Sequence, residues 1–145
     1  MIIKLRNILV LLLWVVFLCT ACIRNNYIKI PVPAVKYVVY PYGGDYELMA
    51  IGGYKIIPNE GYAGIIVYHY SDEEFLAYDL ACPNDYQQGC KVEYFNGDLM
   101  LECPCCGTTF SIFDGFPRSN VDTYPSPLYK YGTSIGANRV VYIYN

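Results

Sequence analysis

Five of the chain's seven cysteines lie within residues 81–110, in two short loops. Clustered thiols bind zinc or iron as thiolates, or pair with one another as disulfides. The sequence therefore predicts a metal centre, a disulfide, or both in this segment. The cysteines concerned are Cys82 and Cys90 in the first loop, and Cys103, Cys105 and Cys106 in the second.

The residues between the two loops predict a β-hairpin. Residues 91–95 and 98–101 alternate apolar and polar side chains, and Asn96-Gly97 separates the two runs. Asn-Gly favours a two-residue hairpin turn because both residues tolerate positive φ. The hairpin would fold the chain back on itself, so we expect the second cysteine loop to lie beside the first.

The cysteine spacing leaves two kinds of chemistry open. The run from Cys103 to Cys106 contains a C-x-x-C knuckle, and Cys82 supplies a third thiolate from the other loop. Either Cys90 or Cys105 could complete a four-sulfur site, and tetrahedral sulfur ligation suits zinc or an iron–sulfur centre. The alternative is two disulfides with one thiol left over.

The elements that must position these loops are predicted to be strands. A chain of 145 residues can form one domain with its own core, and its 17 tyrosines suit half-buried strand surfaces. No sustained 3.6-residue period follows the N-terminus, whereas about nine short strand-like runs alternate with Gly and Pro residues. Residues 35–145 are predicted to form an all-β antiparallel sandwich or barrel, with the cysteine hairpin as a subdomain.

The N-terminus predicts export to a membrane surface. Two basic residues precede an unbroken apolar run over residues 8–18, and small residues then precede Cys22. This pattern resembles a bacterial lipoprotein signal peptide over residues 1–21, with Cys22 as the lipidated first residue, although Cys19 stands where such peptides usually carry Leu. Residues 22–34 follow as a short extended tether. The alternative is an uncleaved single-span anchor, since about 17 apolar residues can just cross a bilayer.

Either anchor would hold the domain in the bacterial cell envelope, where disulfides persist. The residues after Cys22 carry no acidic run, which favours the periplasmic face. An odd number of thiols is hard to reconcile with disulfides alone in that compartment, because a leftover thiol tends to be oxidised. A net charge of −3 provides no basic patch, so no nucleic-acid partner is expected. The expected partners are the membrane, through the lipid anchor, and an unidentified redox or protein partner.

The second loop resembles that of the Rieske [2Fe–2S] family. Residues 103–110 read CPCCGTTF against the family pattern C-P-C-H-G-S-x-F, and they differ at the histidine, which is Cys106, and by a Ser-to-Thr change. Residues 82–90 resemble the first-loop pattern C-x-H-x-G-C with an insertion, and Asn84 occupies the histidine position. The resemblance covers residues 35–145 and implies a Rieske-like fold with a metal centre between the loops.

The resemblance assigns family roles to six residues. It implies one iron on Cys82 and Cys103, the other iron on Asn84 and Cys106, and a loop-tying disulfide between Cys90 and Cys105. An amide oxygen is a hard, neutral donor that is poorly matched to iron in a sulfide cluster. A thiolate in place of imidazole adds negative charge, so the expected reduction potential is lower than in the family.

The two missing histidines also change the expected function. In quinol-oxidising members a ligand imidazole takes up the proton, and neither loop contains an imidazole. The resemblance therefore implies electron transfer without quinol oxidation. The only histidine, His69, falls in the strand-like run over residues 64–70 and is predicted to be a half-exposed strand residue.

Three hypotheses share this fold. The first is a membrane-tethered Rieske-type [2Fe–2S] electron carrier with Cys82, Cys103, Cys106 and Asn84 as ligands. The second is a structural zinc on the three cysteines and a fourth donor. The third is a metal-free structural or binding module stapled by disulfides. No Ser/His/Asp set or paired carboxylates favour an enzyme.

Overall fold

The computed structural model describes residues 27–95, 99–119 and 126–145. Within these ranges the chain is all-β, its strands pair antiparallel, and its helical turns span three residues each. The predicted all-β antiparallel class is confirmed, and the sheets are open rather than closed into a barrel. The helical turns are η1 (Tyr46–Leu48), η2 (Tyr86–Gln88) and η3 (Ala137–Arg139).

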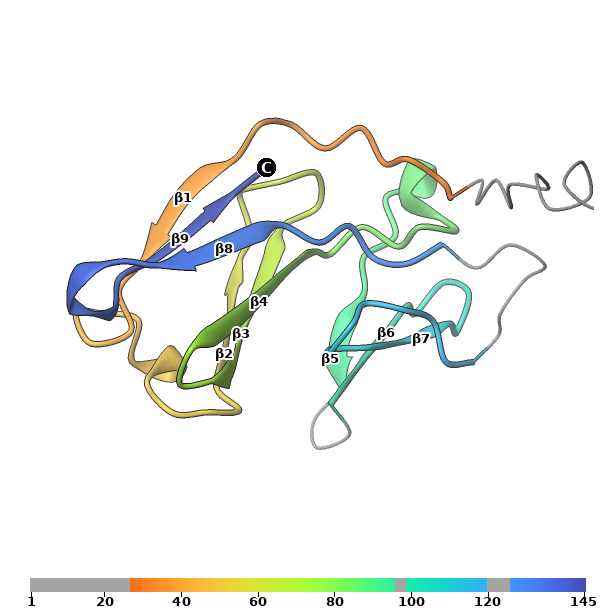
Figure 1. Cartoon of the computed structure of the whole chain (residues 1–145). Coiled ribbons are helices and arrows are strands. Elements are labelled where there is room, and N and C mark those ends of the chain that lie inside the picture. The colour runs from red at the N-terminus through yellow and green to blue at the C-terminus, as the bar shows by residue number, and fades with distance from the viewer. Residues whose placement is uncertain (1–26, 96–98, 120–125) are drawn as a thin grey trace, which may run out of the picture.

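The described strands form three sheets of three strands each (Figure 1). In spatial order, the first sheet is β2 (Tyr54–Ile57), β3 (Ile65–Ser71) and β4 (Glu74–Asp79), the second is β1 (Lys36–Val39), β9 (Val141–Tyr144) and β8 (Gly132–Ile135), and the third is β5 (Glu93–Phe95), β6 (Met100–Glu102) and β7 (Thr109–Ser111). The first two sheets make a sandwich, and the third belongs to a smaller subdomain that carries the cysteine loops.

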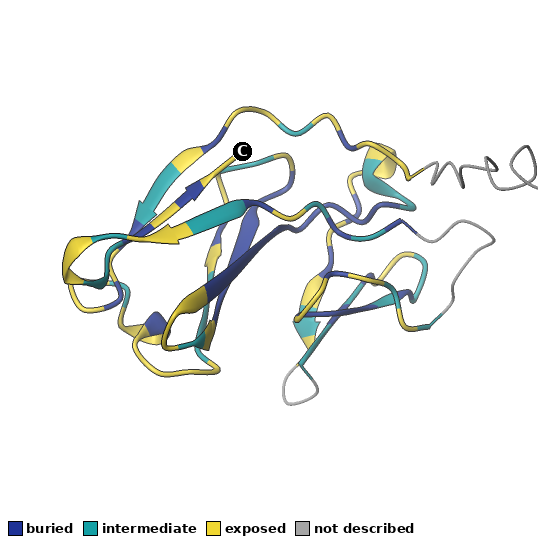
Figure 2. Cartoon of the chain, viewed as in Figure 1, coloured by how far each residue is buried: buried dark blue, intermediate teal, exposed yellow. Residues whose placement is uncertain are grey.

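Strand β3 lies between two hydrophobic cores, which explains its continuous apolar sequence. Ile65 and Val67 point into the sandwich core, while Ile66 and Tyr68 point into a second core shared with the cysteine loops. A strand covered on both faces needs apolar residues at every position instead of at alternate ones. The first five residues of β3 are accordingly buried (Figure 2).

His69, at the end of this buried run, is not the half-exposed residue that the sequence predicted. Its side chain is 1% exposed and stacks on Phe75 with ring centroids 4.2 Å apart. Neither ring nitrogen has a hydrogen-bond partner in the described part of the chain. The prediction was wrong because the sequence of β3 does not reveal which elements cover the face that His69 shares with Ile65 and Val67, and in the fold this face packs into the sandwich core.

The hairpin between the cysteine loops forms as predicted. β5 pairs with β6 from Glu93 opposite Glu102 to Phe95 opposite Met100. Its turn, Asn96-Gly97, lies outside the described residues. β6 then pairs with β7, so the second cysteine loop becomes the connection between two neighbouring strands.

The first cysteine loop is anchored to the sandwich by a buried carboxylate. Asp79, the last residue of β4, is fully buried and accepts four hydrogen bonds. Oδ1 accepts from the backbone N–H groups of Ala63 (3.1 Å) and Ala81 (2.9 Å), and Oδ2 accepts from the Tyr62 N–H (2.7 Å) and the Tyr131 hydroxyl (2.7 Å). A buried charge is tolerated when its lone pairs are satisfied in this way.

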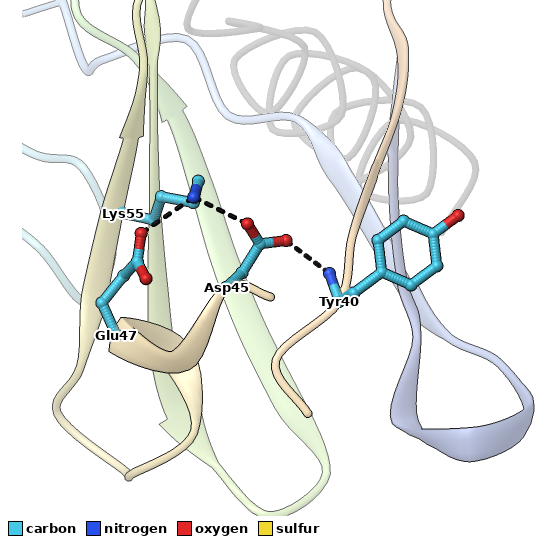
Figure 3. A network of polar contacts seen from close by, with 4 residues as sticks. All are labelled: Tyr40, Asp45, Glu47 and Lys55. Carbon is cyan, nitrogen blue, oxygen red and sulfur yellow. Dashed lines mark hydrogen bonds and ion pairs between the residues drawn. The ribbon is translucent and has the colours of Figure 1, made fainter. Parts of the chain in front are cut away.

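A second polar network fixes the connection between β1 and β2 (Figure 3). Lys55 lies 2.6 Å from an Asp45 carboxylate oxygen and 2.8 Å from one of Glu47, and Asp45 also accepts a hydrogen bond from the Tyr40 N–H (2.6 Å). Hydrogen bonds to the two carboxylates raise the pKa of Lys55. Lys55 and Asp45 are half-buried and Glu47 is exposed, so solvent screens the charges and this network contributes little to stability.

The predicted signal peptide over residues 1–21, Cys22 and the first part of the tether lie outside the described residues. The rest of the predicted tether packs on the domain: Ile30 is buried, and the Ile28 N–H donates to Ser126 Oγ (2.8 Å). Across residues 27–95, 99–119 and 126–145, no helix has the length and apolarity to cross a membrane.

The Asp79 contacts predict a specific loss of stability. We expect Asp79→Asn to lower the free energy of unfolding by about 3 kcal/mol, because an amide NH2 group would face N–H donors that then lack an acceptor. Tyr131→Phe removes one of the four bonds and should cost about 1 kcal/mol. Urea unfolding of both variants measures the difference, and equal losses would contradict this account.

Candidate metal centre

Short backbone hydrogen bonds close each cysteine loop at its base. In the first loop, the Cys82 N–H donates to the Cys90 carbonyl (3.1 Å), so the loop begins and ends at adjacent points. In the second loop, the Cys103 N–H donates to the Thr108 carbonyl (2.9 Å) and the Gly107 N–H donates back to the Cys103 carbonyl (2.8 Å). Both loops therefore hold their cysteines on tight, defined turns.

A disulfide joins the two loops. Cys90 and Cys105 are bonded, with their Cα atoms 6.3 Å apart. The pairing that the family resemblance implied is thus confirmed. The bond leaves three free thiols among the described cysteines, and it holds the first loop against the second.

The three free thiols converge with one carboxylate. Cys82 and Cys103 are buried, Cys106 is half-buried, and the Cys82 and Cys106 sulfurs are 3.7 Å apart. These three sulfurs and a carboxylate oxygen of Asp85 all lie within 4.8 Å of one another. Thiolate and carboxylate donors in this arrangement could hold a metal ion.

Asn84 takes part in the site as a hydrogen-bond donor. Its side-chain nitrogen lies 3.2 Å from Thr108 Oγ1 and 3.8 Å from the Cys106 sulfur. The Cys106 thiol itself donates to Thr108 Oγ1 over 3.2 Å. Asn84 and Thr108 thus surround Cys106 with polar groups that can orient a thiolate.

The surroundings make Cys106 easier to ionise than Cys82. Burial raises the pKa of Cys82, and the neighbouring Cys103 thiol raises it further. Hydrogen bonds from the backbone N–H groups of residues 84 and 85 lower this pKa by a smaller amount. Burial and the neighbouring Asp85 side chain act to raise the pKa of Cys106. Hydrogen bonds with the side chain and backbone of Thr108 and with Cys103 act in the opposite direction, and the net shift is downward.

The distance between the Cys82 and Cys106 sulfurs fits two thiolates on one metal ion. Two thiolates at about 2.3 Å from one tetrahedral metal are about 3.8 Å apart. The Cys82 and Cys106 sulfurs are separated by 3.7 Å. In the arrangement that the family resemblance implies, Cys82 and Cys106 would ligate different irons, and bridging sulfides would hold them farther apart.

The comparisons with known proteins add no family assignment. No protein-family model matches the chain, and no curated protein matches it. The resemblance to the Rieske family therefore rests on the motifs of the two cysteine loops.

Sequence reasoning identified the three cysteines that meet at the site and missed Asp85. A signal for it was present: Cys82-Pro-Asn-Asp85 has the same spacing as Cys103-Pro-Cys-Cys106. Each loop thus begins with Cys-Pro and places a second metal-binding side chain three residues after the first. Because Asp is common in solvated loops, its residue type alone does not predict a ligand.

The disulfide predicts both a chemical and a stability result. A digest of non-reduced protein should contain the Cys90 peptide linked to the Cys105 peptide, as mass spectrometry would detect. A Cys90→Ala, Cys105→Ala variant should lose about 3 kcal/mol of unfolding free energy, since the bond closes a loop with a sequence separation of 15. Alkylation of Cys90 in unfolded, non-reduced protein would contradict the assignment.

Proposed function

We propose that this protein is a lipid-anchored envelope protein whose β domain is a metal-binding module that holds one structural Zn²⁺ ion. The observation that carries the proposal is the meeting of three free thiols from two loops, with two of their sulfurs 3.7 Å apart. The metal would cross-link the loops beside the disulfide and fix the surface that they form.

Zinc suits this site better than other metals. Thiolate-rich tetrahedral sites select zinc or iron–sulfur centres, and zinc needs no redox partner in an oxidising compartment. Two of the three thiols are fully buried, as expected for a closed structural site rather than a catalytic one with an open position. Bound zinc would also keep the three thiols from oxidation.

Electron transfer through a [2Fe–2S] cluster, which the family resemblance implies, is less well supported. That function needs two irons where the donor atoms fit one metal. Quinol oxidation is further disfavoured because the only histidine, His69, is buried against Phe75 in the sandwich. Detection of a [2Fe–2S] cluster would therefore overturn the zinc proposal in favour of electron transfer.

The lipid anchor at Cys22 would place the module at the periplasmic face of the membrane. The membrane is then its first partner, and a further protein partner would contact the exposed surface. A structural zinc requires no electron donor or acceptor, so this function needs no redox partner.

Metal analysis tests the zinc proposal. Full-length protein purified without oxygen should contain one zinc per chain and no acid-labile sulfide. A Cys82→Ser, Cys106→Ser variant should lose the metal, whereas the disulfide variant should still bind one zinc at saturation. Iron and sulfide in equal amounts, two of each per chain, would establish the cluster instead.

The anchor has a separate test. The N-terminal peptide of the mature protein should begin at Cys22 and carry the mass of a lipid modification. Cys22→Ala should abolish this modification and the processing that accompanies it, with Cys19→Ala as the matched control. An unmodified protein of full length that stays in the membrane would favour the single-span anchor.

A further inference from the structure

The two cysteine loops are matched in spacing, and this match points to a fourth ligand. In the second loop, Cys103 is followed three residues later by Cys106. In the first loop, Cys82 is followed three residues later by Asp85. Paired knuckles of this spacing are the usual way in which two loops surround one tetrahedral metal.

The carboxylate of Asp85 is placed as a ligand would be. Its Oδ1 accepts a hydrogen bond from Gln88 Nε2 over 3.4 Å. Its Oδ2 is buried and has no hydrogen-bond partner among the described residues. A buried carboxylate oxygen without a partner is costly, and a metal ion beside it removes that cost. One Asp85 oxygen lies within 4.8 Å of all three sulfurs.

The neighbouring Asn84 does not compete for the fourth position. Its side-chain nitrogen faces Cys106 and Thr108, so the amide acts as a donor to groups around the metal. A donor to a thiolate ligand belongs to the outer shell, where it orients the sulfur and offsets its charge. Asn84 and Asp85 therefore hold different roles although they are adjacent.

Local hydrogen bonds offset part of the charge of such a site. Three thiolates and one carboxylate exceed the charge of a divalent ion by two. The backbone N–H groups of residues 84 and 85 donate to the Cys82 sulfur, and the backbone N–H of Thr108 donates to the Cys106 sulfur. Such donors offset part of the negative charge on metal-bound thiolates.

From these observations we infer that Asp85 is the fourth ligand of a mononuclear Cys3Asp zinc site, an inference that rests on the proposed zinc function. Asp85 and Cys106 are half-buried, whereas Cys82 and Cys103 are buried. The metal therefore has a less buried side, formed by Asp85 and Cys106.

Cobalt substitution of the full-length protein tests the ligand set. Co²⁺ replaces zinc in tetrahedral sites, and its sulfur-to-metal charge-transfer absorption increases with the number of thiolates. Asp85→Cys should raise this absorption in the ratio of four thiolates to three, and it should slow the loss of zinc to a chelator. Asp85→Ala should keep the thiolate absorption, change the ligand-field bands, and lower zinc affinity by more than about 100-fold, beyond the effect of an outer-shell change.

Asn84→Ala is the matched control. It should lower zinc affinity by about 10–100-fold, as loss of an outer-shell donor does, and leave the ligand-field bands of Co²⁺ unchanged. If Asp85→Ala leaves affinity and spectrum unchanged while the wild type binds one metal, Asp85 is not the ligand and the zinc function stands. If the wild type binds no metal at all, the proposed function itself fails.

Discussion

The buried carboxylate of Asp79 is the interaction on which the cysteine loops depend. It accepts hydrogen bonds from the turn before β3, from Ala81 at the entrance to the first loop, and from Tyr131 on the segment that leads into β8. Burial raises the pKa of Tyr131, and so does its hydrogen bond to Asp79. The Tyr131 hydroxyl therefore keeps its proton and remains a donor. One side chain thus fixes where the chain leaves the sandwich. Cys82 follows Ala81 directly, and its position depends on that exit.

The subdomain that carries the loops needs covalent or metal cross-links. Its three strands have three residues each, and small sheets of this kind rarely bury enough apolar surface to be stable alone. The shared core with β3 and β4 supplies part of the stability, and the disulfide between Cys90 and Cys105 supplies another part. A metal ion on the remaining thiols would complete the connection between the loops. The two cross-links use different cysteines, so they can exist together.

The sequence was informative where the signal is local. Alternating runs around Asn96-Gly97 predicted the hairpin, and short strand-like runs between Gly and Pro predicted the antiparallel all-β class. It was uninformative where the cause lies elsewhere in the chain. His69 is buried because other elements cover its strand, and local alternation does not record that layer. The convergence of Asp85 with three sulfurs depends on how the hairpin and the disulfide bring the loops together. Its spacing from Cys82 was visible in the sequence, but the proximity of its carboxylate to the sulfurs was not.

We propose that the paired loops hold one metal ion rather than two. X-ray absorption at the metal edge of the anaerobically purified full-length protein tests it directly. We expect sulfur neighbours at about 2.3 Å, one oxygen neighbour at about 2.0–2.2 Å, and no second metal nearby. A neighbouring metal bridged by sulfide would contradict it and would restore the two-iron cluster that the loop motifs imply.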